Sequence, residues 1–215
     1  MVWMVVLVLI VCLYCVIERS GNQDRGQQGE TEIYDTLKKL GGRKVMLSNC
    51  YLPLRNGETT EVDLILIHES GIYVIESKNY RGQIFGSETQ KYWTQSFSDR
   101  QGSTHKYRFY NPVWQNDTHI KALQRVLGDP KVNVYSYIVF GNECVLMDIE
   151  QRSDDYCVIQ RKNLLSVVKA TARAHRKRLS NKMIHEYYGR LHPYTRVSEK
   201  KKAEHAHRVH EKYGA

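Results

Sequence analysis

The sequence predicts an α/β fold with the order helix, three strands, a further hairpin, a second helix and another strand. Three stretches support this order. Residues 29–42 have helical apolar spacing, residues 61–80 have the pattern of two adjoining strands, and residues 111–140 contain an amphipathic helix followed by an apolar strand. With 41% hydrophobic residues, a chain of 215 residues can bury one substantial core, so we expect one main domain with appended segments.

The first predicted helix begins this domain. Ile33, Leu37 and Leu40 recur at helical spacing, and the glycines at positions 41 and 42 end the pattern. Glu30 and Glu32 lie near the start, where the helix dipole favours carboxylates. Taken alone, these two residues need no functional explanation.

Three strands are predicted to follow the helix. Residues 44–54 form the first strand, and residues 61–80 form a hairpin rich in β-branched and aromatic residues with a His-Glu-Ser-Gly turn. If the chain reverses symmetrically about Glu69 and Ser70, the register pairs Ile67 with Ile72, Ile65 with Val74, and Asp63 with Glu76.

The pairing of Asp63 with Glu76 is unusual, because like charges that face each other in a sheet destabilise it. Strand alternation places Lys78 on the same face as Glu76. A divalent cation held by both carboxylates would account for the arrangement. A bulge at Gly71 would shift the pairing by one residue and separate the carboxylates. A solvated strand end with scattered charges is the alternative interpretation.

The remaining elements of the domain follow the hairpin. Residues 98–108 are polar and basic, which predicts an exposed loop. Residues 111–127 begin with Asn-Pro and carry an apolar stripe, which predicts a helix. Gln115 and His119 are one turn apart on this helix and share a face. Further strands are expected at residues 83–86, 91–97, 132–140, 144–149 and 156–159.

The charge and cysteine content narrow the class of protein. A formal net charge of +9 and a pI of about 9.3 favour a polyanionic partner, either nucleic acid or an anionic membrane surface. The chain has 5 cysteines, an odd number, and no C-x-x-C pair outside the apolar N-terminal run. Neither a disulfide framework nor a zinc site is predicted, and a reducing compartment fits best.

The N-terminal segment predicts a membrane anchor. Residues 1–17 contain no charge, proline or glycine, and a helix of that length rises about 25 Å, within the range that spans a bilayer. A cleaved signal peptide is the main alternative, but the segment lacks a positive start and small residues before a cleavage site. Because the nearby positive charges follow the segment, we expect a single-pass cell-membrane protein with its soluble domain in the cytoplasm.

The C-terminal region, residues 161–215, has helical periodicity and many basic residues. Its HRKR and EKKK runs suit phosphate contacts, and Tyr187, Tyr188 and Tyr194 suit stacking on bases. A solvated basic helix or tail explains the same composition. Contact with anionic lipid beside a tethered domain is a third interpretation.

The main domain, residues 29–160 after a polar linker at 18–28, resembles a known family. Five pieces occur in the family's order: Gly29-Glu30, VDLILI, GIYVIESKN, a Trp-bearing strand and NPVWQNDTH. Together they resemble the NERD (nuclease-related) domain from residue 29 to 127, and more weakly to residue 140. The resemblance implies a restriction-endonuclease-like αβββαβ core with a mixed central sheet, because that family is similar to the PD-(D/E)xK nucleases.

The resemblance also assigns candidate catalytic and metal-binding residues. Asp63 and Glu76 match the two motif carboxylates, and Lys78 matches the motif lysine. Ser77 stands between them, at a position whose carbonyl commonly joins the metal shell. Glu30 matches the acidic residue of the first helix, with Glu32 as a less favoured substitute.

Gln115 and His119 match the family's N-P-x-x-Q-x-x-x-H element. They are expected to contact the nucleic-acid backbone or to brace the site. The resemblance thus implies a membrane-tethered, metal-dependent nuclease or DNA-processing phosphodiesterase that uses Mg²⁺ or Mn²⁺, with DNA rather than RNA as its partner. A catalytically silent nucleic-acid-binding or interaction module with the same fold is the alternative.

Overall fold

The computed structural model describes residues 25–99, 101–175 and 178–213. The part of the chain that it describes is a mixed α/β structure with two mixed sheets and five helices. The predicted anchor at residues 1–17 lies outside this part. None of the helices within it is long and apolar enough to cross a bilayer.

The helices are a first helix at residues 25–38, α2 (Pro112–Leu127), α3 (Arg161–Ala174), α4 (Asn181–Leu191) and α5 (Glu199–Tyr213), with a 3₁₀ turn at His192–Thr195. The larger sheet contains β1 (Lys44–Pro53), β2 (Thr59–His68), β3 (Gly71–Lys78), β7 (Val134–Phe140) and β9 (Tyr156–Gln160) in the order β1-β2-β3-β7-β9. The smaller sheet contains β4 (Gly82–Ser87), β5 (Tyr92–Ser98), β6 (Thr104–Tyr110) and β8 (Cys144–Glu150) in the order β6-β5-β4-β8.

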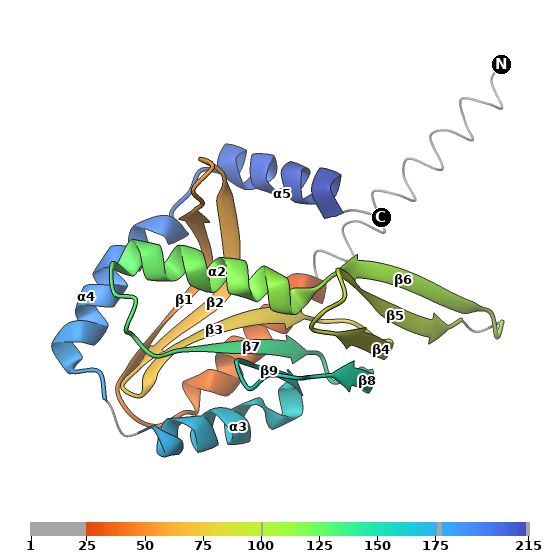
Figure 1. Ribbon diagram of the computed structural model, residues 1–215, viewed down its shortest axis with the longest axis horizontal. Coiled ribbons are helices and arrows are strands. Elements are labelled where there is room, and N and C mark those ends of the chain that lie inside the picture. Colours follow the sequence, from red (N-terminus) through yellow and green to blue (C-terminus); the bar gives the residue numbers. More distant parts are fainter. Residues whose placement is uncertain (1–24, 100, 176–177, 214–215) are drawn as a thin grey trace.

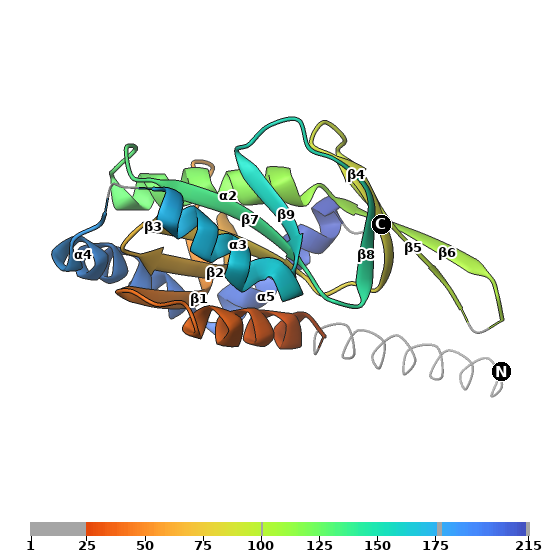
Figure 2. The same cartoon turned by 90° about the horizontal axis from the view of Figure 1, so that it is seen from below.

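The larger sheet has helices on both faces (Figures 1 and 2). α2 and α4 pack on one face, and the first helix and α3 pack on the other. β1, β2 and β3 are antiparallel, whereas β7 and β9 run parallel to β3. Because β2 and β3 are covered on both sides, their sequences are nearly continuous apolar runs.

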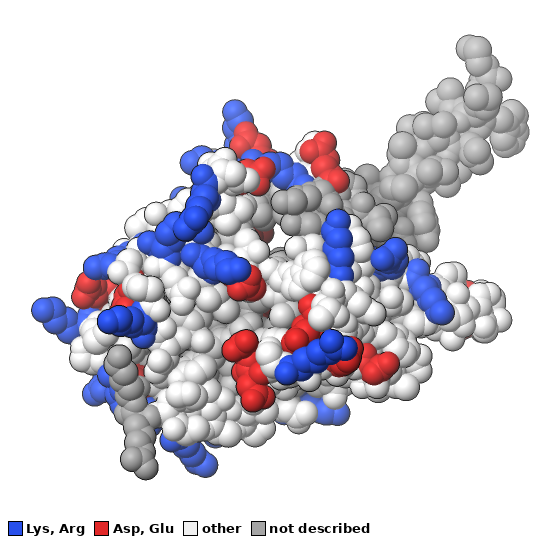
Figure 3. Space-filling view, viewed as in Figure 1, with Lys and Arg blue, Asp and Glu red and all other residues white. Residues whose placement is uncertain are grey.

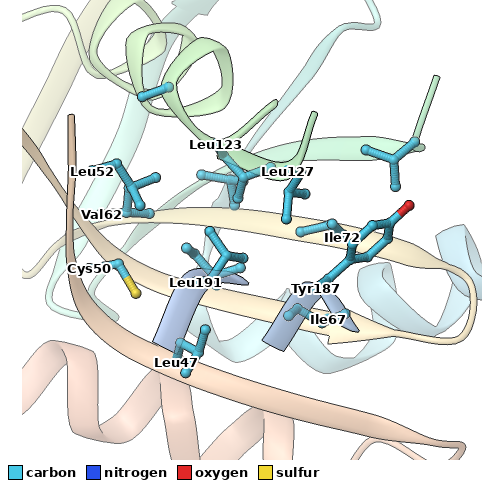
Figure 4. Packing of buried hydrophobic residues seen from close by; sticks show 14 of the residues in the cluster. Leu47, Cys50, Leu52, Val62, Ile67, Ile72, Leu123, Leu127, Tyr187 and Leu191 are labelled. Carbon is cyan, nitrogen blue, oxygen red and sulfur yellow. The ribbon is translucent and has the colours of Figure 1, made fainter. Parts of the chain in front are cut away.

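The core between the sheet and α2 is shown in Figure 4. Ile67 and Ile72 from the hairpin meet Leu123 and Leu127 of α2, and Leu191 of α4 closes the same cluster. All five side chains are fully buried. Truncating a buried leucine such as Leu123 to alanine costs about 2–5 kcal/mol, so this cluster holds α2 firmly against the strands.

The smaller sheet joins the larger one where β3 and β7 end. Trp93 of β5 has no exposed surface, and its ring stacks on Phe140 of β7 with centroids 6.2 Å apart. Its indole Nε1 donates to the Ser87 carbonyl at 2.9 Å. A Cβ at position 86 would lie 2.3 Å from the Trp93 ring, so only glycine fits there. This packing places β5 and β6 beside the carboxyl end of β3.

The predicted hairpin register is confirmed through four residues of each strand. Ile67 pairs with Ile72 and Ile65 with Val74, and the ladder runs without a bulge to its last pair, Leu64 with Ile75. The predicted helix at 111–127 and the strands at 44–54 and 132–140 are also present, with small differences at their ends.

Three expectations differ from the structure. The predicted exposed loop at 98–108 is wrong for its second half, because β6 begins at Thr104 and pairs with β5. The first helix already includes residues 25–28 of the expected linker. The C-terminal region is not a separate solvated tail, since α4 buries Ile184 and Leu191 in the core.

Candidate active site

The site begins where β2 and β3 separate. Beyond the Leu64–Ile75 pair, the Ser77 amide donates to Oδ2 of Asp63 at 2.7 Å, so a carboxylate replaces the next backbone acceptor. Asn49 of β1, at the matching position, has a left-handed backbone with φ of 53°. The irregularity lets the partly buried Asp63 side chain reach across to β3.

Glu76 lies at the centre of the site with 1% of its surface exposed. The Lys78 ammonium contacts Glu76 Oε1 at 2.6 Å, as strand alternation predicts, and His119 Nε2 contacts Oε2 at 3.0 Å. Lys78 also donates to the Gln115 side-chain oxygen at 3.2 Å. The two residues predicted to share a face of α2 therefore both reach the Glu76–Lys78 pair.

The start of α2 is fixed by the sequence at the Asn-Pro dipeptide. The Asn111 side chain caps the helix by accepting from the Val113 amide at 2.9 Å, and Pro112 occupies the first turn. The Asn111 amide group also donates to the carbonyls of Ser87, Glu88 and Gln90 in the smaller sheet. Asn111 thus ties α2 to the smaller sheet and sets the height of Gln115 and His119 over β3.

His119 connects the helix to β2 as well. Its Nδ1 lies 2.8 Å from the Thr60 hydroxyl, and only 2% of the residue is exposed. Because both ring nitrogens have protein partners, His119 is placed to orient Glu76. This geometry favours the bracing role over direct contact with nucleic acid.

The charges at the site are unequally compensated. Burial and the negative charge of Glu76 raise the pKa of Asp63 well above its ordinary value. Burial alone would raise the pKa of Glu76, but Lys78 and His119 hold it below its ordinary value. For Lys78, burial opposes the charged form, yet the neighbouring Glu76 raises the pKa and keeps the ammonium charged.

Two more carboxylates belong to this cluster. Burial and the charges of Glu61 and Glu76 raise the pKa of Glu30 to about 7. Burial likewise raises the pKa of Glu61, with a further contribution from Glu76, while the Tyr51 hydroxyl donates to Glu61 at 2.6 Å and lowers it. Sequence reasoning missed Glu61, although strand alternation places it near Asp63 on β2.

These residues fit a divalent cation by their chemistry. Asp63, Glu30 and Glu61 are oxygen donors whose pKa values are raised by crowding, and a cation would relieve that crowding. A carboxylate oxygen that already accepts one hydrogen bond keeps a second lone pair for a metal, so Glu76 can serve while it contacts Lys78. Among the described residues, no three acidic, His or Cys side chains are already gathered into a complete metal-binding group.

A cavity of about 1320 Å³ opens beside the cluster. Asp63, Glu61 and Lys78 line it from the larger sheet, and Arg108 lines it from β6. α5 forms another wall with His205 and Arg208, which both lie 3.4 Å from the Thr59 hydroxyl. His205 is buried and packs edge-on against Tyr51 with ring centroids 5.5 Å apart. Sequence reasoning did not foresee that the basic C-terminal region reaches this cavity.

Two sequence-based candidates lie elsewhere. Glu32 pairs with Arg161 at the start of α3, on the other side of the first helix, so it is not a substitute for Glu30. Tyr187 has 4% of its surface exposed and its hydroxyl donates to Asp129 at 2.6 Å. The expectation that Tyr187 stacks on bases is therefore wrong, because the ring belongs to the core of α4.

Comparison with known proteins agrees with the resemblance seen in the sequence. A family model described as the nuclease-related domain, NERD, matches residues 25–141. An uncharacterized protein of Bacillus anthracis is 29% identical over 168 residues, which are 78% of this chain and 76% of the relative. No solved structure matches the chain significantly. The matched range contains the Asp63, Glu76 and Lys78 cluster, whereas α3, α4 and α5 lie beyond it.

Proposed function

Because the chain belongs to the nuclease-related domain (NERD) family, we propose that it is a metal-dependent nuclease that hydrolyses nucleic-acid phosphodiester bonds at Asp63, Glu76 and Lys78. The observation that carries the proposal is the buried Glu76, which holds Lys78 at 2.6 Å beside a carboxylate-rich cavity. Such a charge cluster costs stability unless it serves a function.

We assign the fold more finely on the same grounds. The first helix, β1, β2, β3, α2 and β7 follow one another in the αβββαβ order of restriction-endonuclease-like cores, with β4, β5 and β6 inserted before α2. In such a core, the acidic pair and the lysine lie on the second and third strands. Asp63 on β2 and Glu76 and Lys78 on β3 occupy those strands.

Each residue has a chemical task in this proposal. Mg²⁺ or Mn²⁺ held by Asp63, Glu76 and the Ser77 carbonyl would neutralise phosphate charge and lower the pKa of a bound water. Lys78 stays charged beside Glu76, so it can donate to a phosphate oxygen or orient the attacking water. Gln115 and His119 hold Lys78 and Glu76 in place from α2.

The walls of the cavity suit a polyanionic substrate. Arg108 from β6 and Arg208 from α5 line the cavity together with Lys78. Arginine is well matched to phosphate, because its planar fork donates two parallel hydrogen bonds. The carboxylates lie at the metal end of the same cavity, so the two kinds of charge have separate roles. DNA is the proposed partner.

Membrane attachment remains part of the proposal. The uncharged apolar run at residues 1–17 supports a single-pass anchor with the nuclease domain in the cytoplasm. Alkaline carbonate extraction of membranes tests it. The full-length chain should stay in the pellet, and a chain that lacks residues 1–17 should be released. Liposomes with and without anionic lipid then show whether the basic C-terminal region adds contact.

The test of activity uses the purified full-length chain with labelled single- and double-stranded DNA and RNA. Mg²⁺, Mn²⁺ or a chelator is added. We expect cleavage with metal and none with chelator. Asp63→Ala and Lys78→Ala should each slow cleavage by about 100-fold or more, the usual cost of losing a group that stabilises the transition state.

Asp35→Ala is the matched control, because Asp35 is an exposed carboxylate of the first helix whose partner is Lys38. It should cleave at the wild-type rate. Equal cleavage by wild type, Asp63→Ala and Lys78→Ala would sink the proposal. Metal-independent, salt-sensitive binding without cleavage would instead identify a catalytically silent nucleic-acid-binding module.

A further inference from the structure

The hairpin of β5 and β6, which we call the ribbon, projects from the body of the molecule (Figure 1). Its pairs are Trp93 with Phe109, Gln95 with Tyr107, and Phe97 with His105. Odd-numbered residues of both strands therefore share one face. On this face, aromatic side chains continue from the buried Trp93 outward to the exposed end of the ribbon.

The outer rings are stacked and accessible. Phe97 and Tyr107 are nearly parallel, with an interplanar angle of 9° and centroids 5.6 Å apart. The Arg81 guanidinium lies 4.6 Å from the Phe97 centroid, on the same ladder. Tyr107 is 53% exposed. Cross-strand stacking stabilises a ribbon, but it does not require a large ring that remains open to water.

The edge of the ribbon is cationic. β6 is an edge strand, and its exposed Lys106 and Arg108 alternate with Tyr107, so they project from the opposite face. Figure 3 shows Lys and Arg side chains in a row along β6. Near the tip, both oxygens of the Asp99 carboxylate are engaged, by the Gln101 and Ser103 amides and by His105. The acidic residue therefore does not offset the row of cations.

The ribbon leads directly into the proposed active site. Arg108, Phe109 and Tyr110, at the inner end of β6, line the cavity that also contains Asp63 and Lys78. Arg108 is held over the Tyr92 ring at 4.9 Å, which fixes its position between the ribbon and the cavity. A chain that follows the edge of β6 would reach the carboxylate cluster without leaving a cationic surface.

We propose that the ribbon is a binding site for single-stranded nucleic acid, which stacks an unpaired base on Tyr107 and lays its phosphates along Lys106 and Arg108. A duplex hides its base faces, so this mode selects single strands. The inference rests on the proposed function for the fate of the strand in the cavity. Binding at the ribbon needs neither metal nor catalysis, so the two can be tested separately.

The test measures fluorescence anisotropy of a labelled oligothymidine of about 20 nucleotides, long enough to cover a typical single-strand site. The full-length chain is used with a chelator, which prevents metal-dependent cleavage. Tyr107→Ala should weaken binding by about 5- to 100-fold, and Tyr107→Phe should bind like wild type because it keeps the ring face. Met147→Ala, at a 52% exposed residue on β8, should have no effect.

Lys106→Gln provides a second measurement that does not depend on the aromatic ring. The slope of log affinity against log salt should fall by about 1 relative to wild type, as for the loss of one phosphate contact. A blunt duplex of the same length should respond weakly to Tyr107→Ala. The inference is overturned if Tyr107→Ala binds the single strand as tightly as wild type, or weakens single strand and duplex equally.

The outcomes also separate this inference from the proposed function. If binding depends on Tyr107 while the wild-type chain never cleaves nucleic acid, the ribbon site stands and the nuclease proposal fails. If cleavage depends on Asp63 while Tyr107→Ala binds normally, the nuclease proposal stands and the ribbon site fails.

Discussion

Glu76 shows how one residue can organise the site. It is almost fully buried, and its two oxygens contact Lys78 and His119. Removing one partner of a buried charge pair costs about 3–5 kcal/mol, because the other charge is left uncompensated. The pair is therefore placed with the precision of a core residue, although its chemistry is that of a functional site.

His119 is expected to act through Glu76 as a positioning residue. His119→Ala should lower kcat by about 10- to 100-fold, as for other groups that orient a metal ligand, and should leave the KM for nucleic acid nearly unchanged. His119→Gln, whose amide can still donate to Glu76, should recover part of the loss. Steady-state kinetics measures both constants, with thermal melting as the check on folding. A rise in KM with constant kcat would contradict this role.

Glu30 and Glu32 provide a matched pair on one helix. Glu30 lies in the carboxylate cluster, whereas Glu32 pairs with Arg161. Glu30→Gln should raise the Mg²⁺ concentration needed for half-maximal cleavage by about 10-fold or more, because it removes a charge near the metal. Glu32→Gln should not change it. Metal titrations of the cleavage rate compare the two, and identical curves would remove Glu30 from the site.

His68 predicts a pH dependence of stability away from the site. Burial lowers the pKa of His68, and its ring contacts the Gly41 carbonyl at 2.9 Å and the Ser70 hydroxyl at 2.7 Å. The folded state favours the neutral ring. The stabilisation is therefore complete above the unfolded value of about 6.5 and is lost as the pH falls through the lower folded pKa.

Urea unfolding between about pH 7 and pH 5 measures this effect. The free energy of unfolding should fall more steeply with decreasing pH in wild type than in His68→Gln. The exposed His185→Gln should keep the wild-type slope. Parallel curves for wild type and His68→Gln would show that His68 is not the source.

The residues of the site were only partly predictable from sequence. Asp63, Glu76 and Lys78 follow from hairpin alternation, and the one-turn spacing of Gln115 and His119 is visible in the helix pattern. Glu61 could have been found by the same alternation. Its partner Tyr51 lies on β1, and no local pattern shows which residue of one strand faces another across a long connection.

At the level of elements, the strongly apolar segments were predicted and the polar ones were not. β2, β3 and β7 are buried on both faces, so their composition specifies them. β6 is polar and basic on its open edge, and only its pairing with β5 makes it a strand. α5 has few apolar residues, and its contact with β2 and Tyr51 depends on the tertiary fold.

α5 is expected to contribute to substrate binding. Arg208 lines the cavity, whereas Lys201 on the same helix is exposed and does not. Arg208→Ala should raise the KM for nucleic acid several-fold, roughly the 1–3 kcal/mol of a charge-assisted hydrogen bond, with little change in kcat. Lys201→Ala should match wild type at equal salt. Equal KM values for the two variants would mean that α5 only covers the cavity.

At the level of the whole molecule, the two sheets divide the work. The larger sheet and its helices hold the carboxylates and Lys78 rigidly, and the smaller sheet carries the ribbon to the mouth of the cavity. The cluster of Ile84, Trp93, Ile138 and Phe140 joins the sheets, so the ribbon is fixed relative to the site at its inner end. The sequence did not predict two sheets, because strand order depends on long-range pairing.

The central claim is that Asp63 and Glu76 hold a divalent metal beside Lys78, and Mn²⁺ binding measured by calorimetry tests it most directly. Wild type and Glu32→Gln should bind Mn²⁺ with equal affinity. Asp63→Asn should bind about 10-fold more weakly or worse, since it replaces a charged oxygen ligand with a neutral one. Equal Mn²⁺ affinity in wild type and Asp63→Asn, or no binding by wild type, would contradict the account.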